Sequence, residues 1–399
     1  MSLLLITEVF PPRTGGSGRW FREIYGRLPR DRVVVMAGEC PGQGAFDDAD
    51  GPRVVRAPLS LPSWGLMHPA SLRGYASLLA RLIRTARAEG TTAVHCGRCL
   101  PEGLMALALK ALGGPPYACF VHGEEIPIVA ASRELAWLAR RVFRGAEVVV
   151  ANSQNTRRVL QERLGLPPGR VVVLNPGVDT RAFRPAPRRA EVRERLGWGD
   201  RPVVLTVGRL QERKGHDRLI RALGAVREAI PDVLYAILGD GVERDRLAAL
   251  AAREGVEGHV QFLGERDDET LVRCYQQCDL FALPNREVGG DFEGFGMVLV
   301  EAQACGRPVL AGDSGGTAET MRIPETGRVV PCEGPGPLAA AVVDLLSDRA
   351  RLDRMGEAAR EWAVGQFDWD SLVREWSRTF PWPVGRHDPG PDAAAEAPR

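Results

Sequence analysis

The feature of this sequence that most constrains its fold is a regular alternation of short β-rich runs with longer amphipathic stretches. In the first half, β-rich runs fall at residues 3–7, 32–37, 53–56, 92–96, 117–122, 147–151 and 171–174. Helical periodicity falls at residues 19–28, 72–89, 134–143 and 153–164. This β-α-β-α order is typical of a parallel sheet that helices cover on both faces.

The alternation stops at a Pro- and Arg-rich stretch, residues 183–190, and then starts again. The second set of β-rich runs covers residues 203–207, 233–238, 260–262, 280–283, 308–311 and 327–330. Its helical stretches cover residues 216–229, 243–254, 267–277, 296–304, 319–322 and 338–347. We therefore predict an α/β chain with two doubly wound Rossmann-like domains that face each other across a cleft, with ligands at the carboxyl ends of the strands.

The same pattern predicts the domain boundaries. An N-terminal Rossmann-like domain covers residues 1–183, and a C-terminal one covers residues 184–365. Residues 349–380 have helical periodicity, and we expect the segment 366–383 to pack back toward the first domain. The low-complexity tail, residues 384–399, is predicted to be disordered.

Charge is unevenly distributed along the chain, although the net charge is only +1. Up to Arg184 there are 24 basic and 15 acidic residues, against 28 and 36 in the remainder. This asymmetry fits an anionic ligand or surface on one side, and it equally fits two differently charged solvated halves. No apolar run approaches the roughly 20 residues of a membrane span. The N-terminus lacks a basic leader, so we expect a cytoplasmic protein.

The eight cysteines do not form the pattern of a disulfide scaffold. Cys96 and Cys99 form a C-x-x-C motif, and Cys274 and Cys278 lie four apart on a predicted helix. A structural zinc site needs its cysteine pairs in one small module, and these pairs lie in opposite halves. We therefore expect buried free thiols and no metal, with a redox dithiol at Cys96 and Cys99 as the alternative.

Two turns carry groups suited to a phosphate. Gly15 and Gly16 precede a predicted helix, where free backbone N–H groups favour an anion, although a merely structural turn explains them as well. Arg209 and Lys214 follow the predicted strand at residues 203–207, and both can reach one phosphate group. Lys214 is one of only two lysines in an Arg-rich chain, which strengthens this interpretation.

Two carboxylates lie on either side of another predicted anion-binding turn. Glu293 precedes a glycine turn, and Glu301 lies inside the apolar helix predicted at residues 296–304. A carboxylate in such a helix is costly unless it is paired or binds a ligand. Free N–H groups at residues 295–298 favour an anion, and carboxylates accept hydrogen bonds from sugar hydroxyls.

Two further strand ends carry candidate groups. His122 ends the predicted strand at residues 117–122 and should face the cleft, with a structural histidine as the alternative. Asp240 and Gly241 form a turn whose backbone could contact a base or a phosphate. Neither predicted domain has the fingerprint of a dinucleotide-binding dehydrogenase.

In chain order these motifs are joined by Asn152-Ser153 and by Ala304-Cys305-Gly306-x-Pro308-Val309. Together, over roughly residues 1–380, they resemble family 4 retaining glycosyltransferases of the GT-B fold. Within that family the chain is most similar to the phosphatidylinositol mannosyltransferase branch. The resemblance implies that Arg209 and Lys214 hold the donor diphosphate, while the loop with Gly15 and Gly16 closes on it.

The resemblance also implies roles for the remaining candidates. Glu293 would bind the hydroxyls of the donor sugar, Glu301 the ribose, and His122 the sugar near its reacting carbon. Further donor contacts would come from Asp240, Gly241, Phe295, Gly296, Met297 and Val298. In this family the departing phosphate oxygen takes the proton of the acceptor, so no carboxylate base is required. We also expect no cofactor and no divalent metal.

We therefore expect a retaining hexosyltransferase of cell-envelope or polysaccharide synthesis that uses a nucleotide-sugar donor and a glycan or lipid-linked acceptor. GDP-mannose is the favoured donor, and UDP-glucose or UDP-N-acetylglucosamine stay open. A nucleotide-sugar binding protein without turnover is the alternative class, and no nucleic acid partner is expected.

Arg19 and Arg73 are candidates for an acceptor phosphate, whereas Glu124 and Glu125 beside His122 disfavour an anion there. Helices at residues 72–89 and 134–144 mix apolar side chains with arginines. That pattern suits a peripheral contact with an anionic membrane, at the inner face of the plasma membrane, and it also suits ordinary packing on a core.

Overall fold

A computed structural model describes residues 2–13, 15–47, 51–67 and 69–379. Internal contacts divide the chain into two compact units. Among the described residues, the first unit lies within 2–119, 144–147 and 370–379, and the second lies within 120–143 and 148–369. The predicted boundary at residue 183 stays a prediction. The predicted tail at 384–399 lies outside the described residues.

The first sheet has seven strands in the order β3-β2-β1-β4-β5-β6-β7. Their bounds are β1 Ser2–Thr7, β2 Val33–Gly38, β3 Arg53–Ala57, β4 Thr91–Cys96, β5 Tyr117–Val121, β6 Val148–Ala151 and β7 Val171–Val173. The helices of this half are α1 Gly16–Tyr25, α2 Gln43–Asp47, α3 Pro69–Ala88, α4 Leu104–Ala111, α5 Glu125–Ala130, α6 Arg133–Gly145 and α7 Gln154–Leu164. The central strand β1 pairs in parallel with both β2 and β4.

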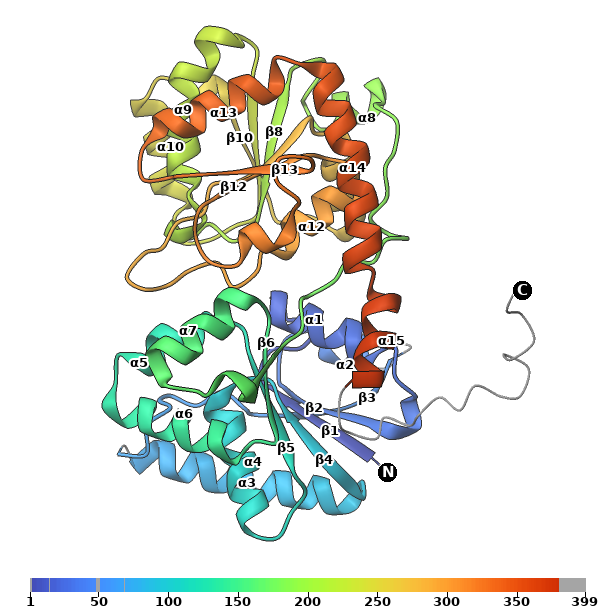
Figure 1. Ribbon diagram of the computed structural model, residues 1–399, viewed down its shortest axis with the longest axis vertical. Helices are drawn as coiled ribbons and strands as arrows, with labels where there is room; N and C mark the ends of the chain where they lie inside the picture. The colour runs from blue at the N-terminus through green and yellow to red at the C-terminus, as the bar shows by residue number, and fades with distance from the viewer. Residues whose placement is uncertain (1, 14, 48–50, 68, 380–399) are drawn as a thin grey trace, which may run out of the picture. The chain divides into compact units, whose positions relative to one another are not determined.

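The second sheet has six strands in the order β10-β9-β8-β11-β12-β13, and helices lie on both of its faces (Figure 1). Its strands are β8 Val203–Val207, β9 Leu234–Leu238, β10 Val260–Gly264, β11 Leu280–Leu283, β12 Val309–Gly312 and β13 Gly327–Val330. The helices that follow the first sheet are α8 Ala190–Arg195, α9 His216–Ala229, α10 Arg244–Arg253, α11 Asp268–Gln277, α12 Met297–Ala304, α13 Pro335–Leu346, α14 Arg349–Phe367 and α15 Trp369–Thr379. Two parallel sheets of this kind confirm the predicted α/β class with two Rossmann-like sheets.

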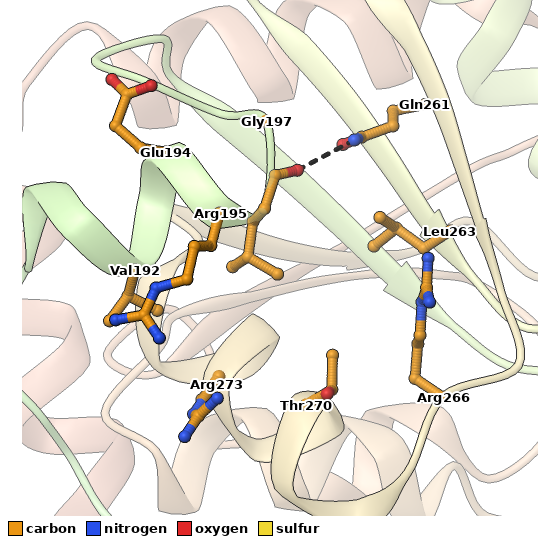
Figure 2. Close-up of a pocket in the computed structure, with 10 residues that line it drawn as sticks. Val192, Glu194, Arg195, Gly197, Gln261, Leu263, Arg266, Thr270 and Arg273 are labelled. Carbon is orange, nitrogen blue, oxygen red and sulfur yellow. Dashed lines mark hydrogen bonds between the residues drawn. The ribbon is translucent and has the colours of Figure 1, made fainter.

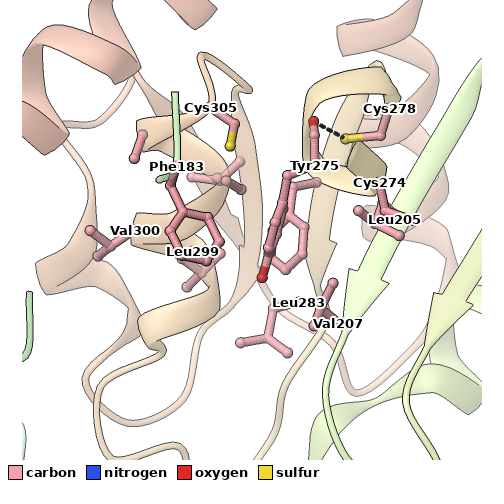
Figure 3. Close-up of a cluster of buried hydrophobic side chains, with 14 of the residues drawn as sticks. Phe183, Leu205, Val207, Cys274, Tyr275, Cys278, Leu283, Leu299, Val300 and Cys305 are labelled. Atoms are coloured by element: carbon pink, nitrogen blue, oxygen red, sulfur yellow. Dashed lines mark hydrogen bonds between the residues drawn. The ribbon is translucent and has the colours of Figure 1, made fainter. Parts of the chain in front are cut away.

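The core of the second unit lies on both faces of its sheet. Along β8, Leu205 and Val207 pack into one buried cluster, while Val204 beside Leu205 packs into the cluster on the opposite face. Alternate side chains of a strand point to opposite faces, so a strand buried on both sides is apolar throughout. Tyr275 lies in the first of these clusters, with its ring centroid 5.9 Å from that of Phe183 (Figure 3).

The structure differs from the predicted elements in a few places. The short helices α2, α4, α5 and α8 were not expected, and the helix expected at 319–322 is a single 3₁₀ turn, Thr317–Thr320. The helical segment expected at 349–380 is two helices, α14 and α15, that Asp368 separates. Within the first unit, Asp370 of α15 accepts a hydrogen bond at 2.8 Å from Arg27, which follows α1.

All eight cysteines are free thiols, and all but Cys40 are buried. Burial raises the pKa of Cys96, and the neighbouring Glu102 raises it further. A thiol held in its neutral form is a poor nucleophile.

Candidate functional site

Two neighbouring strands of the second sheet bring the strongest candidates together. β8 continues through a loop into the 3₁₀ turn Glu212–Lys214 and then into α9. β11 pairs with β8 in parallel, and the chain after it runs through a long loop to α12. Both strands end at the same edge of the sheet. The loop after β8, which carries Arg213 and Lys214, therefore meets the loop after β11, which carries Glu293.

At this edge Glu293 is the centre of a buried charged cluster. Its Oε2 accepts hydrogen bonds from Arg213 Nη1 at 2.7 Å and from Lys214 Nζ at 2.5 Å. All three residues are buried, and 9% of Glu293 is exposed. Arg213 Nε also lies 3.1 Å from a carboxylate oxygen of Asp291, which extends the cluster toward solvent. The cluster therefore has two cations and two carboxylates at the carboxyl end of the sheet.

The pKa shifts of the cluster follow from burial and from these pairs. Burial disfavours the charged carboxylate of Glu293, but Lys214 and Arg213 outweigh it and lower its pKa to about 2. Burial lowers the pKa of Lys214, and the charge of Arg213 lowers it further, against the opposing effect of Glu293. Burial raises the pKa of Asp291. A desolvated amine beside a firmly ionised carboxylate can exchange that partner for a ligand phosphate.

Arg209 does not share this cluster. Its side chain is 63% exposed, and its guanidinium lies 3.7 Å from the carboxylate of Glu124. The guanidinium that shares Glu293 with Lys214 belongs to Arg213, which was not among the predicted site residues. The dipeptide Arg213-Lys214 was a visible signal, because two adjacent cations in a strand-end loop are suited to a diphosphate.

Glu301 is buried inside α12, as the sequence analysis expects, and the structure supplies a partner for it. Tyr275 Oη donates a hydrogen bond to Glu301 Oε2 at 2.8 Å. The carboxylate is therefore satisfied in part by a side chain 26 residues away, which no local pattern could indicate. A role in ribose binding stays a prediction.

The start of α12 lies between these two glutamates. Gly296 is the N-cap and Met297 the first helical residue, followed by Val298. The ring of Phe295 is buried in the core, 5.8 Å from that of Phe367 between centroids, so only its backbone is suited to contact a donor. The first N–H groups of a helix have no partner within it, so this helix start is suited to an anion.

Asp240 and Gly241 form the predicted turn after β9. The exposed Asp240 carboxylate accepts a hydrogen bond from the N–H of Gly241 at 2.7 Å, and its carbonyl accepts one from Leu210 N–H at 2.9 Å. This loop is thus bonded directly to the loop after β8.

His122 follows β5 and lies beside the end of β6. Its carbonyl accepts a hydrogen bond from Asn152 Nδ2 at 2.8 Å. Its N–H donates to the carboxylate of the buried Glu125 at 3.1 Å, so Glu125 closes the turn after the strand. Glu124, by contrast, is exposed and pairs with Arg209. The two glutamates that the sequence analysis treated alike therefore have different surroundings.

The remaining candidates lie in the first unit. Gly15 is the N-cap of α1, Gly16 is its first residue, and Arg19 lies in its first turn. Arg73 lies near the start of α3 and is exposed. Their roles in donor and acceptor binding stay predictions.

A separate pocket of about 440 Å³ lies over the edge strand β10, between α8 and α11 (Figure 2). Gln261 Nε2 donates to the carbonyl of Leu196 across it at 2.9 Å. Arginines at its rim are partly balanced by acids, since Arg273 pairs with Glu269 at 2.5 Å. None of the predicted site residues lines this pocket.

Comparison with known proteins gives one consistent result. The model of Glycosyltransferase Family 4 matches residues 14–182, and that of Glycosyl transferases group 1 matches residues 188–362. The chain is 37% identical over 382 residues to the GDP-mannose-dependent alpha-(1-6)-phosphatidylinositol monomannoside mannosyltransferase of Mycobacterium tuberculosis, covering 93% of this chain and 96% of that one. It is 38% identical over 376 residues to the protein of the same name from Mycolicibacterium smegmatis, covering 92% and 95%.

Solved structures agree on the fold. Anabaena HepE in complex with UDP has a TM-score of 0.81 and 23% identity, with 95% of this chain and 99% of that chain covered. WaaG, a glycosyltransferase involved in lipopolysaccharide biosynthesis, has a TM-score of 0.71 and 20% identity, with 95% and 100% covered. Both likenesses concern the fold, which is GT-B with two Rossmann-like sheets.

Proposed function

Because this chain belongs to the retaining glycosyltransferases of family 4, we propose that it transfers a mannosyl group from GDP-mannose to a lipid-linked mannoside of the cell envelope. The donor and the acceptor class rest on the relatives, which are 37–38% identical over more than nine-tenths of the chain and are described as GDP-mannose-dependent. No helix among the described residues has the length and apolar character needed to cross a membrane.

The observation that carries the proposal is the buried contact of Lys214 and Arg213 with Glu293 at the carboxyl ends of β8 and β11. A nucleotide sugar brings two negative phosphates and a sugar rich in hydroxyls. Lys214, with Arg209 reaching in from solvent, stabilises the charge that develops on the diphosphate as it leaves. Glu293 then accepts hydrogen bonds from sugar hydroxyls, which need an acceptor fixed in its ionised form.

The reaction requires one bond to break and one to form at the anomeric carbon. The bond from that carbon to the diphosphate oxygen breaks, and its electron pair leaves with GDP. A hydroxyl oxygen of the acceptor forms the new bond on the same face of the sugar, and its proton passes to the departing phosphate oxygen. In this scheme the protein supplies cations and position rather than a base. The N–H groups at the start of α12 add to the stabilisation, and His122 lies at the sugar. We propose that no divalent metal takes part.

A lipid-linked acceptor requires contact with a membrane surface, and we place this contact on α5 and α6. Trp137 is 54% exposed, and the guanidinium carbon of Arg141 lies 5.2 Å from the centroid of the Trp137 ring. Ile128 is 53% exposed. Exposed apolar side chains among arginines suit the inner face of an anionic membrane. Sedimentation with vesicles that contain phosphatidylinositol should pull the protein down at low salt and release it at high salt, whereas binding that is absent or independent of salt would contradict this placement.

Turnover with defined substrates tests the proposal directly. The purified chain is incubated with GDP-mannose, UDP-glucose or UDP-N-acetylglucosamine and with a phosphatidylinositol mannoside acceptor, and the product is identified by mass. We expect a product of one added hexose with GDP-mannose, and an α-linkage by NMR. Transfer only from a UDP-sugar would overturn the donor, and release of no nucleotide from any donor would overturn the enzymatic function.

A further inference from the structure

Glu319 makes a contact that the donor site does not use. Its carboxylate binds the start of α7 with both oxygens: Oε2 accepts from the N–H of Gln154 at 2.7 Å and Oε1 from the N–H of Asn155 at 2.8 Å. Ser153, the N-cap, accepts from the N–H of Thr156 at 3.0 Å. Three of the first N–H groups of the helix thus have acceptors, and the positive end of the helix dipole favours the carboxylate.

The cap comes from far along the chain. Glu319 lies in the 3₁₀ turn Thr317–Thr320, 165 residues after Gln154. A local side chain would satisfy the helix start equally well, as Ser153 shows at the next N–H group. Two hydrogen bonds to one planar carboxylate also fix orientation, which a single bond does not. The contact therefore holds the turn with Glu319 in one position against α7.

Two glycines allow the backbone near Glu319, the backbone after Glu293 and the strand end with His122 to come into close contact. A Cβ added to Gly294 would lie 2.1 Å from the carbonyl oxygen of His122 and 2.7 Å from Asn152 Nδ2. A Cβ added to Gly316 would lie 2.4 Å from the carbonyl oxygen of Gly294. Distances below 3.0 Å leave no room for a side chain. The turn after Glu293 is therefore in direct backbone contact with the strand end that carries His122.

From this arrangement we propose that Glu319 is a positioning residue, which by capping α7 holds His122 in register with Glu293 and its turn. Ser153 and Asn152 directly precede the capped residues, and Asn152 is bonded to His122, so the constraint reaches His122 through two covalent neighbours and one hydrogen bond. The inference rests on the proposed function in one respect: His122 must lie at the reacting sugar.

Loss of the contact between Glu319 and α7 should affect nucleotide binding and turnover differently. The groups assigned to the nucleoside diphosphate lie on the loops after β8 and β11 and on α12, and Glu319 contacts none of them through a hydrogen bond in the described residues. Loss of the cap should leave nucleotide affinity unchanged and lower kcat, because displacement of a group at the reacting carbon by about 1 Å can cost about 100-fold.

The test combines two substitutions. Glu319→Ala should lower kcat by about 10- to 100-fold with GDP affinity within about threefold of wild type. Glu319→Gln keeps one acceptor oxygen and should retain intermediate kcat, and it is the variant to use if the alanine variant does not fold. The matched control is Glu162→Ala, which removes an exposed carboxylate from the same helix and should leave kcat unchanged. Denaturation of each variant establishes that it is folded at the assay temperature.

The decisive readout is the double variant with His122→Ala. If Glu319 acts through His122, then Glu319→Ala and His122→Ala together should lower kcat no further than His122→Ala alone. Multiplied effects would overturn the proposal, as would wild-type kcat in both glutamate variants or in His122→Ala. Turnover is measured with whichever nucleotide sugar the wild-type chain uses. A UDP-sugar preference would therefore contradict the proposed donor without affecting this result.

Discussion

At the scale of single residues, Lys214 has the central role in the proposed reaction. Its amine is buried and bonded to Glu293, and burial together with Arg213 lowers its pKa. Replacement with alanine removes a cation from the leaving diphosphate. We expect Lys214→Ala to lower kcat at least about 100-fold, the scale typical of losing one group that stabilises developing charge.

The chain offers a matched control for this change. Lys110, the other lysine, forms an ion pair with Glu147 at 2.7 Å and is 36% exposed. Lys110→Ala should leave steady-state kinetics unchanged. Equal steady-state kinetics for Lys214→Ala and Lys110→Ala would show that Lys214 takes no part in the reaction.

Glu293 gives a prediction on pH. Its pKa is about 2 in the folded chain, below the ordinary value of 4.5, because Lys214 and Arg213 outweigh its burial. A carboxylate with a lowered pKa adds stability that is present above about pH 4.5 and is lost as the pH falls toward 2. The difference in free energy of unfolding between wild type and Glu293→Gln should therefore narrow by about 2 kcal/mol from about pH 6 to about pH 3.

Urea denaturation of both proteins at a series of pH values measures this difference. The amide that Glu293→Gln introduces does not titrate, so the variant serves as the reference for every other titrating group. A difference that stays constant over the whole range would show that the ion pairs at Glu293 do not stabilise the folded chain.

At the scale of elements, the start of α7 is a buried cap. Ser153 is fully buried, and its Oγ accepts from the N–H of Thr156 and bonds the hydroxyl of the same residue, each at 3.0 Å. We expect Ser153→Ala to lower the free energy of unfolding by about 1 kcal/mol, as for other N-cap serines. Ser347→Ala, at the exposed end of α13, should change it by less than about 0.5 kcal/mol.

Equilibrium denaturation compares the two serine variants. Equal stabilities would mean that Glu319 satisfies the start of α7 without help from the N-cap.

Sequence periodicity predicted the long elements well. The strands β8, β11 and β13 and the helix α9 have the predicted bounds. β8 and β11 are short, fully buried runs and α9 has an apolar stripe, each between clear turn residues. It missed α2, α4, α5 and α8, which have five to eight residues each and too few turns to establish a period. It also joined α14 to α15. At the break, Asp368 forms a β-bridge with Val178 and accepts a hydrogen bond from Thr180, and both partners lie far away in the sequence.

Prediction of the site from the sequence likewise located residues but missed long-range contacts. Motifs at strand ends located Lys214, Glu293 and Glu301, since parallel strands end at one edge of a sheet. They did not reveal that Arg213 shares Glu293, that Tyr275 supports Glu301, or that Glu319 caps α7. Each of these contacts joins residues 26 or more positions apart, and only the folded chain places them together.

At the scale of the whole molecule, the structure has the two parallel sheets that the sequence predicts, and the family to which the chain belongs has the same fold. The sequence repeats the alternation of strands and helices on either side of residues 183–190, and the structure has a sheet of seven strands and a sheet of six. The uneven charge of the halves fits a chain whose basic half meets an anionic surface, which is the contact proposed for α5 and α6.

We propose above all that Lys214, held in the buried cluster with Arg213 and Glu293, binds the diphosphate of GDP-mannose without a metal. Calorimetry of GDP, UDP and ADP binding to the wild-type chain and to Lys214→Ala, in buffer with EDTA, tests it most directly. The account predicts that GDP binds the wild-type chain more tightly than UDP or ADP, that EDTA does not change this affinity, and that Lys214→Ala weakens it by at least about 10-fold. Equal GDP affinity in the two proteins, or binding that EDTA abolishes, would contradict the account.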